Sequence, residues 1–332
     1  MNTKRLLFWF PLLGGLLCVF ASPYIQNLYL LNVLNLAVIS GILAVSVNLL
    51  VGYTGQLSLG HAGFYGIGAY TVALLTTKLG CPVWLSFIAA FVICSLTGLA
   101  LGLPTTKLKG HFLGIATLGF GIIINVVINN WIGLTNGPMG VRDIPSPTVL
   151  GISMEYPNYF LAFAAAFLLV IVLIVHFIVN SSVGRAWRCL RKDEITAQVC
   201  GINVYGYKLL AFSISGGIAG IAGALYASFM QFVSPEAFDL NQSITIVTTT
   251  ILGGAGTLFG PLLGTGILTF ISEWLRDFQE LRLVFYGAIL VVMIVFMPQG
   301  VYPYLKSTLA KLFGSGKKRR VEGVRSDERR AH

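Results

Sequence analysis

The chain has 332 residues, of which 56% are hydrophobic and only 10% are charged, and its formal net charge is +10. Soluble domains are about 45–50% apolar and about 25% charged, so this composition excludes a protein whose surface is solvated by charge. Seven stretches lack Asp, Glu, Lys and Arg, and each is long enough for a spanning helix of about 20 residues. Because they do not alternate apolar and polar residues as β-barrel strands do, the sequence predicts an all-α integral membrane protein, a polytopic bundle of helices.

The apolar stretches divide into about ten predicted transmembrane helices. Two of these are irregular, because the one at 240–253 is short and the one at 57–77 is interrupted by glycine. If both are re-entrant segments, eight spans remain. In chain order, the predicted spans are residues 6–22, 28–51, 57–77, 83–103, 111–131, 157–180, 209–232, 240–253, 258–274 and 283–303.

Lysine and arginine gather in the segments that these spans place on one side of the membrane. Since cytoplasmic loops keep an excess of both residues, we expect both termini in the cytoplasm. The chain therefore divides into a single transmembrane domain over residues 1–305 and a basic cytoplasmic tail over residues 306–332. The positive charge suggests contact with anionic lipid headgroups and not with nucleic acid. The basic segments are Lys4–Arg5, Lys107–Lys109, Arg185–Lys192 and Lys306–Arg330.

Two glycine breaks interrupt the apolar pattern, at residues 52–61 and 253–261. Both read G-x-x-G, then a polar residue, then Leu, then Gly, which is a weak internal repeat. Paired interruptions in two halves of a chain indicate a transport pathway; the alternative is tight turns or close helix crossings. The predicted pathway residues are polar or glycine residues at the breaks, with one asparagine that either joins helices or lines the path: Gln56, Ser58, Gly60, His61, Asn125, Gly256 and Thr257.

The chain has no pattern that indicates catalysis or a bound cofactor. The four histidines are scattered without metal-ligand spacing, and Gly314–Lys317 lacks the first glycine, the following Ser or Thr and the preceding strand of a phosphate loop. We therefore predict no catalytic, cofactor-binding or metal-binding residue, and no enzyme activity. The spans also offer few carboxylates or histidines for harvesting an ion gradient, so the energy for transport is expected from outside the chain.

The longest predicted cytoplasmic segment between spans ends in a short amphipathic stretch. After a basic run, Ile195, Val199 and Ile202 are spaced i, i+4 and i+7, which predicts that they share one helix face. Gly201 and Asn203 then end the helix. A helix this short is marginal in water, so we expect it to dock, either on a partner or on the same protein.

Several segments together are similar to a known family. They are Gly52–Tyr70, Asn129–Pro138, Arg188–Asn203, Tyr207–Phe212, Gly220–Ala227, Ser234–Glu236, Leu252–Gly264 and Met297–Gly300. Through them, residues 20–305 resemble the LivM-type permeases of branched-chain amino-acid ABC transporters. The chain departs from the family pattern after Gly119, where Ile122 and Asn125 stand in place of an expected charged pair. Urea permeases are similar in the same segments, so a urea or short-chain amide permease is the alternative, followed by an ion-coupled secondary transporter.

The resemblance implies a multi-pass protein of the bacterial inner membrane that works in a complex. Its partners would be a LivH-type sister permease in a heterodimer, two cytoplasmic ATP-binding subunits and a periplasmic binding protein that delivers leucine, isoleucine or valine. ATP would be bound by the partners, and no cofactor by this chain. A coupling loop at about residues 185–208 would meet an ATPase. The residues assigned to that contact are Asp193, Glu194, Ile195, Ala197, Val199, Gly201, Ile202 and Asn203.

Overall fold

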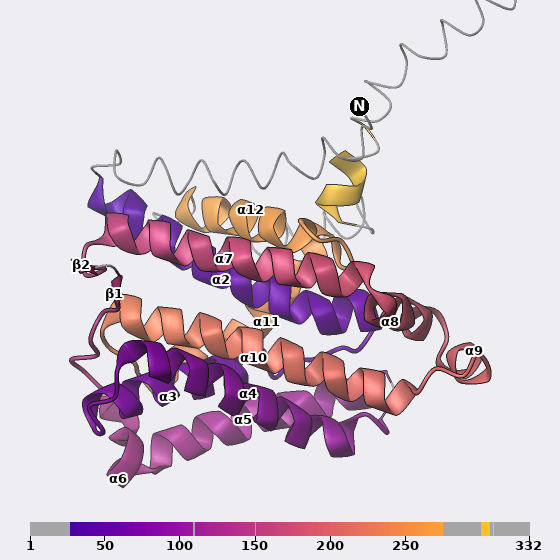
Figure 1. Cartoon of the computed structure of the whole chain (residues 1–332), viewed down its shortest axis with the longest axis horizontal. Helices are drawn as coiled ribbons and strands as arrows, with labels where there is room; N and C mark the ends of the chain where they lie inside the picture. Colours follow the sequence, from indigo (N-terminus) through magenta and orange to yellow (C-terminus); the bar gives the residue numbers. More distant parts are fainter. Residues whose placement is uncertain (1–26, 109, 150, 275–299, 306–307, 309–332) are drawn as a thin grey trace, which may run out of the picture.

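A computed structural model describes residues 27–108, 110–149, 151–274, 300–305 and 308, and the structural statements below concern these residues. They form a bundle of helices whose axes run roughly side by side (Figure 1). The predicted span 6–22, most of the span 283–303 and nearly all of the basic tail lie outside the described residues.

The bundle is built from long helices joined by short ones. Within the described residues, the only sheet is the antiparallel pair β1 (Thr148–Val149) and β2 (Ile152–Ser153). The helices are α2 (Leu28–Val47), the π-helical turn η2 (Asn48–Thr54), α3 (His61–Thr77), α4 (Val83–Thr105), α5 (His111–Asn130), α6 (Ile132–Thr135), η3 (Gly137–Met139), α7 (Pro157–Asn180), α8 (Ser182–Lys192), α9 (Glu194–Val199), α10 (Val204–Met230), η4 (Pro235–Phe238), α11 (Leu240–Gly254) and α12 (Gly260–Trp274).

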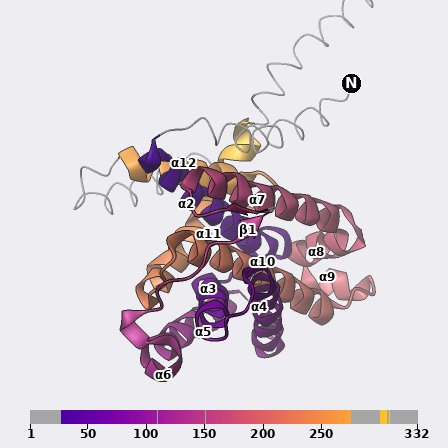
Figure 2. The same ribbon diagram turned by 60° about the vertical axis from the view of Figure 1, so that its left-hand side comes forward.

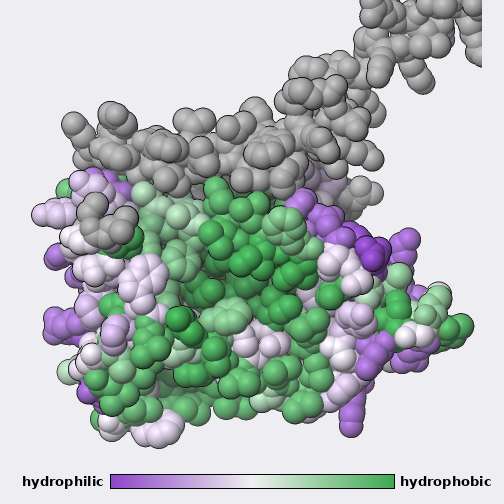
Figure 3. Space-filling model, viewed as in Figure 1, coloured by the Kyte–Doolittle hydropathy of each residue, from purple (hydrophilic) through white to green (hydrophobic). Residues whose placement is uncertain are grey.

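Five helical segments in the described part of the chain are long and apolar enough to cross a membrane by length and composition. They are Leu28–Thr54, Val83–Thr105, His111–Asn130, Pro157–Asn180 and Val204–Met230. The prediction of an all-α membrane protein is confirmed at this level. Figure 3 shows an apolar band across the middle of one face, with hydrophilic residues gathered at both ends of the bundle.

Helix α10 lies at the centre of the bundle and packs against α3 and α4 (Figures 1 and 2). Small residues allow this close approach, because Gly216 and Gly220, and likewise Ala219, Gly223 and Ala227, repeat every four residues in the sequence, a spacing that lets two helices come close. A Cβ atom on Gly216 would collide with the backbone oxygen of Cys94, and one on Gly223 would collide with the backbone of Tyr65. The stripe of small residues is therefore a packing feature of the core.

Three predicted spans begin at other residues in the structure. Helix α3 begins at His61, because residues 55–60 are not helical, and α10 begins five residues earlier than predicted, at Val204. Helix α11 has 15 residues, which is about 22 Å, and α12 begins at Gly260, two residues later than predicted. Because the hydrocarbon core is about 30 Å thick, α11 does not cross it alone as a straight helix.

Candidate coupling segment and translocation pathway

The two glycine breaks meet in the fold, although they are far apart in the sequence. Asn48 joins them, because its Nδ2 donates to the carbonyl oxygen of Thr257 at 2.8 Å and its Oδ1 accepts from the backbone N–H of Gly256 at 2.7 Å. A Cβ atom on Gly52 would collide with this Asn48 side chain and with the backbone nitrogen of Gly256. The internal repeat thus corresponds to a contact between η2 and the segment that joins α11 to α12.

After η2, the first break turns back into the interior of the bundle. Ser58 and His61 are fully buried there. Ser215 on α10 donates to the carbonyl oxygen of Ser46 at 2.7 Å, so its hydroxyl oxygen is left to accept from His61 Nε2 at 2.9 Å. This assignment makes His61 Nδ1 the acceptor for the Ser58 hydroxyl at 3.3 Å. The result is a buried polar network that ties α2, α3 and α10 together.

A pocket of about 200 Å³ opens between the first break, α3, α5 and the start of α11. Asn125 lies in its wall and donates from Nδ2 to the carbonyl oxygens of Pro235 at 2.8 Å and Phe238 at 3.2 Å. The rest of the wall is mostly apolar. The lining residues are Leu59, Ala62, Leu118, Gly121, Ile122, Asn125, Phe238, Asp239, Leu240 and Ser243.

The structure separates the predicted pathway residues into three places. Asn125 lines the pocket, Ser58 and His61 belong to the buried network, and Gly256 and Thr257 lie where the two breaks meet. Gln56 is buried, and its two amide side-chain atoms have no hydrogen-bond partner in the described part of the chain. A role for these residues in translocation stays a prediction.

The structure adds Ser243, which the sequence did not indicate, and gives the surroundings of Gly60, a predicted pathway residue. Ser243 accepts from the backbone N–H of Ala62 at 3.0 Å and lines the pocket. Gly60 packs so closely on α5 that a Cβ atom would collide with the carbonyl oxygen of Thr117. A bulky side chain at Gly60 would therefore disturb helix packing as well as a translocation pathway. Loss of transport in such a variant would not distinguish a role in the pathway from a role in packing.

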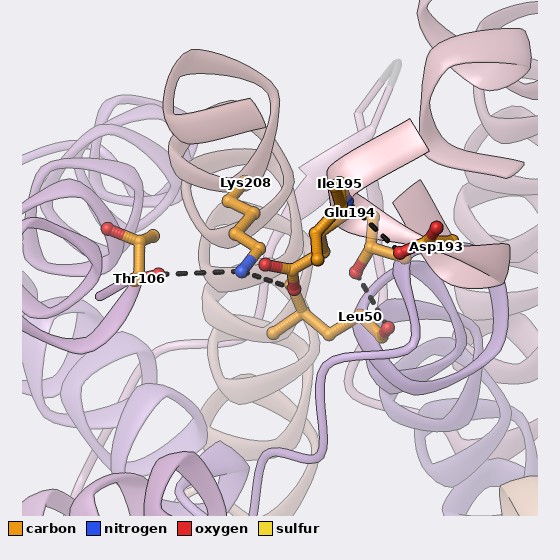
Figure 4. Close-up of polar contacts among 7 residues, drawn as sticks. Leu50, Thr106, Asp193, Glu194, Ile195 and Lys208 are labelled. Atoms are coloured by element: carbon orange, nitrogen blue, oxygen red, sulfur yellow. Dashed lines mark hydrogen bonds and ion pairs between the residues drawn. The ribbon is translucent and has the colours of Figure 1, made fainter. Parts of the chain in front are cut away.

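Helices α8 and α9 lie at the end of the bundle opposite to β1 and β2 (Figure 1). Helix α8 is anchored by Trp187, which is fully buried and donates from Nε1 to the carbonyl oxygen of Tyr207 at 2.9 Å. Asp193 then caps α9, because its carboxylate accepts from the backbone N–H groups of Ile195 at 3.1 Å and Thr196 at 3.3 Å. The short helix is thereby held in a defined orientation (Figure 4).

The apolar face predicted for this segment is only partly present. Ile195 is 65% exposed and Val199 is 84% exposed, so these two do form an outward apolar surface. The prediction is wrong for Ile202, which packs against the hydrophobic core, because α9 ends at Val199 and Gly201 turns the chain with φ +77°. Ala197 faces inward and is buried, so a large residue there would disturb the packing of this chain itself.

An ion pair joins α9 to the rest of the bundle. Lys208 on α10 is only 3% exposed, and its Nζ lies 2.6 Å from Glu194 Oε1 (Figure 4). The same ammonium group donates to the carbonyl oxygen of Thr106, just beyond α4, at 3.4 Å. One buried cation therefore links the start of α9, the start of α10 and the end of α4. The sequence offers only a weak signal for this role, namely a lone lysine at the border of an apolar stretch.

We expect Glu194→Gln to lower the stability of the folded protein by about 1.5–3 kcal/mol, because it leaves the buried ammonium of Lys208 without its counter-ion. The measurement is the melting temperature of the detergent-solubilised chain. Glu155→Gln, in an exposed segment at the other end of the bundle, is the matched control and should have little effect. In a Lys208→Met background, Glu194→Gln should also have little effect; an equal loss in both backgrounds would contradict the pairing.

Comparison with known proteins adds an independent observation. Residues 29–294 match the family described as branched-chain amino acid transport system / permease component. The chain belongs to this family. It is 33% identical to the high-affinity branched-chain amino acid transport system permease protein LivM of Escherichia coli K12, over 92% of this chain and 77% of that protein.

More distant relatives include both kinds of permease. LivH of Escherichia coli K12 is 25% identical, over 84% of this chain and 95% of its own length. The probable LivM of Methanocaldococcus jannaschii is 24% identical, over 65% of this chain and 68% of its own length. No solved structure gives a significant match to this chain.

Proposed function

We propose that this chain is a transmembrane permease subunit of an ATP-binding-cassette importer that carries branched-chain amino acids. The observation that carries the proposal is the family match over residues 29–294, together with the relatives that are named as permeases of branched-chain amino acid transport. The proposed importer lies in the bacterial inner membrane. In it, this chain pairs with a LivH-type permease, two ATP-binding subunits supply energy, and a periplasmic binding protein delivers the substrate.

In this proposal, α9 is the contact with an ATP-binding subunit. Its support is the outward apolar pair Ile195 and Val199, on a helix that is capped by Asp193 and tied to the bundle through Glu194. Apolar side chains in a segment outside the long apolar helices are stabilised by burial against a partner. Asn203 caps α10 by accepting from the backbone N–H of Gly206 at 3.0 Å. A displacement of α9 would therefore move the start of the long helix α10.

The pocket beside Asn125 is the proposed substrate passage. It has a mostly apolar wall with few polar groups, which suits a small amino acid with an aliphatic side chain better than a fully polar solute such as urea. We also propose that both termini and the segment 185–208 face the cytoplasm. Lys and Arg gather in these segments, and cytoplasmic loops carry an excess of both residues.

The proposal is tested with proteoliposomes that contain the assembled importer, its binding protein and ATP. We expect uptake of radiolabelled leucine that requires ATP, is reduced by excess isoleucine or valine, and is unaffected by urea or acetamide. Uptake of urea in place of leucine would support the short-chain amide alternative instead. Uptake that follows a proton or sodium gradient without ATP would contradict an importer of this class.

A further inference from the structure

Arg191 connects α8 with the first glycine break. It lies in the last turn of α8, and its guanidinium donates through Nη1 to the backbone carbonyl oxygen of Gly52. Carbonyl groups in the last turn of a helix have no partner within that helix. The backbone N–H of Gln56 bonds to Leu50 at 2.9 Å, so Gly52 receives its hydrogen bond from another element, α8.

The same side chain lies against the second glycine break. A Cβ atom on Gly256, which has φ +86°, would collide with Nη1 of Arg191. A Cβ atom on Gly55 would lie 3.2 Å from Cγ of Arg191. The Arg191 side chain therefore occupies the space that side chains at these glycines would fill, with its guanidinium at Gly256 and its aliphatic stem at Gly55. Together with the positive φ of both residues, this accounts for glycine at two positions of the repeat. Arg191 thus touches both breaks at the place where Asn48 joins them.

We infer that Arg191 is a positioning residue that passes the movement of α8 and α9 to both glycine breaks. The inference rests on the proposed function, in which α9 meets an ATP-binding subunit. Only Asp193 separates α8 from α9, so the two helices move together. Trp187 ties α8 to α10, whereas Arg191 ties it to η2 and to the segment between α11 and α12.

Arginine suits this role for a chemical reason. Its guanidinium is always charged and presents donors in a fixed plane, whereas the ammonium of lysine is a single point of charge on a flexible stem. If Arg191 acted only as a surface cation, its neighbour Lys192 would be equivalent. Both residues are exposed, but Arg191 donates to Gly52, whereas Lys192 has no hydrogen bond or ion pair within the described ranges. Lys192→Gln is therefore a matched control with the same change of charge.

The first test uses the chain alone and is independent of transport. Amide hydrogen exchange of residues 52–57 and 253–260 is measured by mass spectrometry in the wild type, Arg191→Gln and Lys192→Gln. We expect exchange of residues 52–57 to rise about tenfold or more in Arg191→Gln, from the loss of a hydrogen bond to a charged group. Exchange of residues 253–260 should rise as well, because the guanidinium no longer packs against Gly256, and both segments should stay unchanged in Lys192→Gln. Unchanged exchange in Arg191→Gln, or an equal rise in both variants, would overturn the inference.

The second test uses the assembled importer and measures substrate carried per ATP hydrolysed. We expect this ratio to fall about tenfold in Arg191→Gln, to stay at the wild-type value in Lys192→Gln, and to lie between them in Arg191→Lys. A wild-type ratio in both Arg191 variants would overturn the coupling role. If Arg191→Gln does not assemble, Arg191→Lys decides: a lowered ratio supports the role and a wild-type ratio overturns it. Absence of transport by the wild type would instead count against the proposed function, while the exchange result still tests the contact.

Discussion

Gly52→Ala is expected to abolish transport and to lower the amount of folded protein. The added methyl group would collide with the side chain of Asn48 and with the backbone nitrogen of Gly256. The asparagine can rotate only by giving up its hydrogen bonds to Gly256 and Thr257, and the backbone cannot move without separating the two glycine breaks. Overpacking of this kind costs about 1–3 kcal/mol or more, and here it acts at the junction of two halves of the chain.

The measurements are ATP-dependent uptake and the melting temperature of the purified chain. Gly266→Ala on α12 is the matched control, because no described atom beyond its chain neighbours and the nearby backbone of its own helix lies within 4 Å of the position that the added methyl group would take, and the backbone there is helical. That control should transport normally and be equal or slightly higher in stability, since alanine favours a helix over glycine by roughly 0.5–1 kcal/mol. Wild-type uptake and an unchanged melting temperature in Gly52→Ala would show that the breaks are not in tight contact.

Val199→Asp is expected to weaken the association with the ATP-binding subunit without affecting the fold of this chain. Val199 is 84% exposed, so in this chain alone the substitution removes almost no packing. In the complex it would remove the burial of a valine, worth about 1.5–3 kcal/mol, and would place a charge in an apolar contact. The binding constant should therefore fall by about tenfold to a hundredfold or more.

The measurement is recovery of the ATP-binding subunit when the permease is purified, with the melting temperature of the chain alone as a check on folding. Gln198→Asp is the control, because it adds the same carboxylate at the adjacent exposed position of α9. Ala197→Glu is unsuitable for this purpose, since Ala197 is buried within the chain itself. Equal recovery in Val199→Asp and Gln198→Asp would show that the outward face of α9 is not the contact.

The class of the protein could be predicted from the sequence because each spanning segment must satisfy the same local requirement. In lipid every backbone polar group needs an internal partner, so long apolar stretches predict helices such as α4, α5 and α7 directly. The stripe of small residues on α10 could also be predicted, since close helix contact needs small side chains at a four-residue spacing. The glycine breaks could be located, and the membership of the family confirms what their motifs resemble.

The contacts between these segments were decided only by the tertiary structure. Lipid is as apolar as a helix surface, so hydrophobicity does not indicate which helix face packs inside the bundle and which faces outward. For this reason the sequence could not show that Gly52 lies against Gly256. Helix α9 lies outside the long apolar helices, and only the fold decides that its Ala197 packs inward while Val199 stays exposed. Arg191 belongs to a basic run whose members look equivalent in sequence. Its side chain differs from that of Lys192 because the fold brings a carbonyl group at a helix end within its reach.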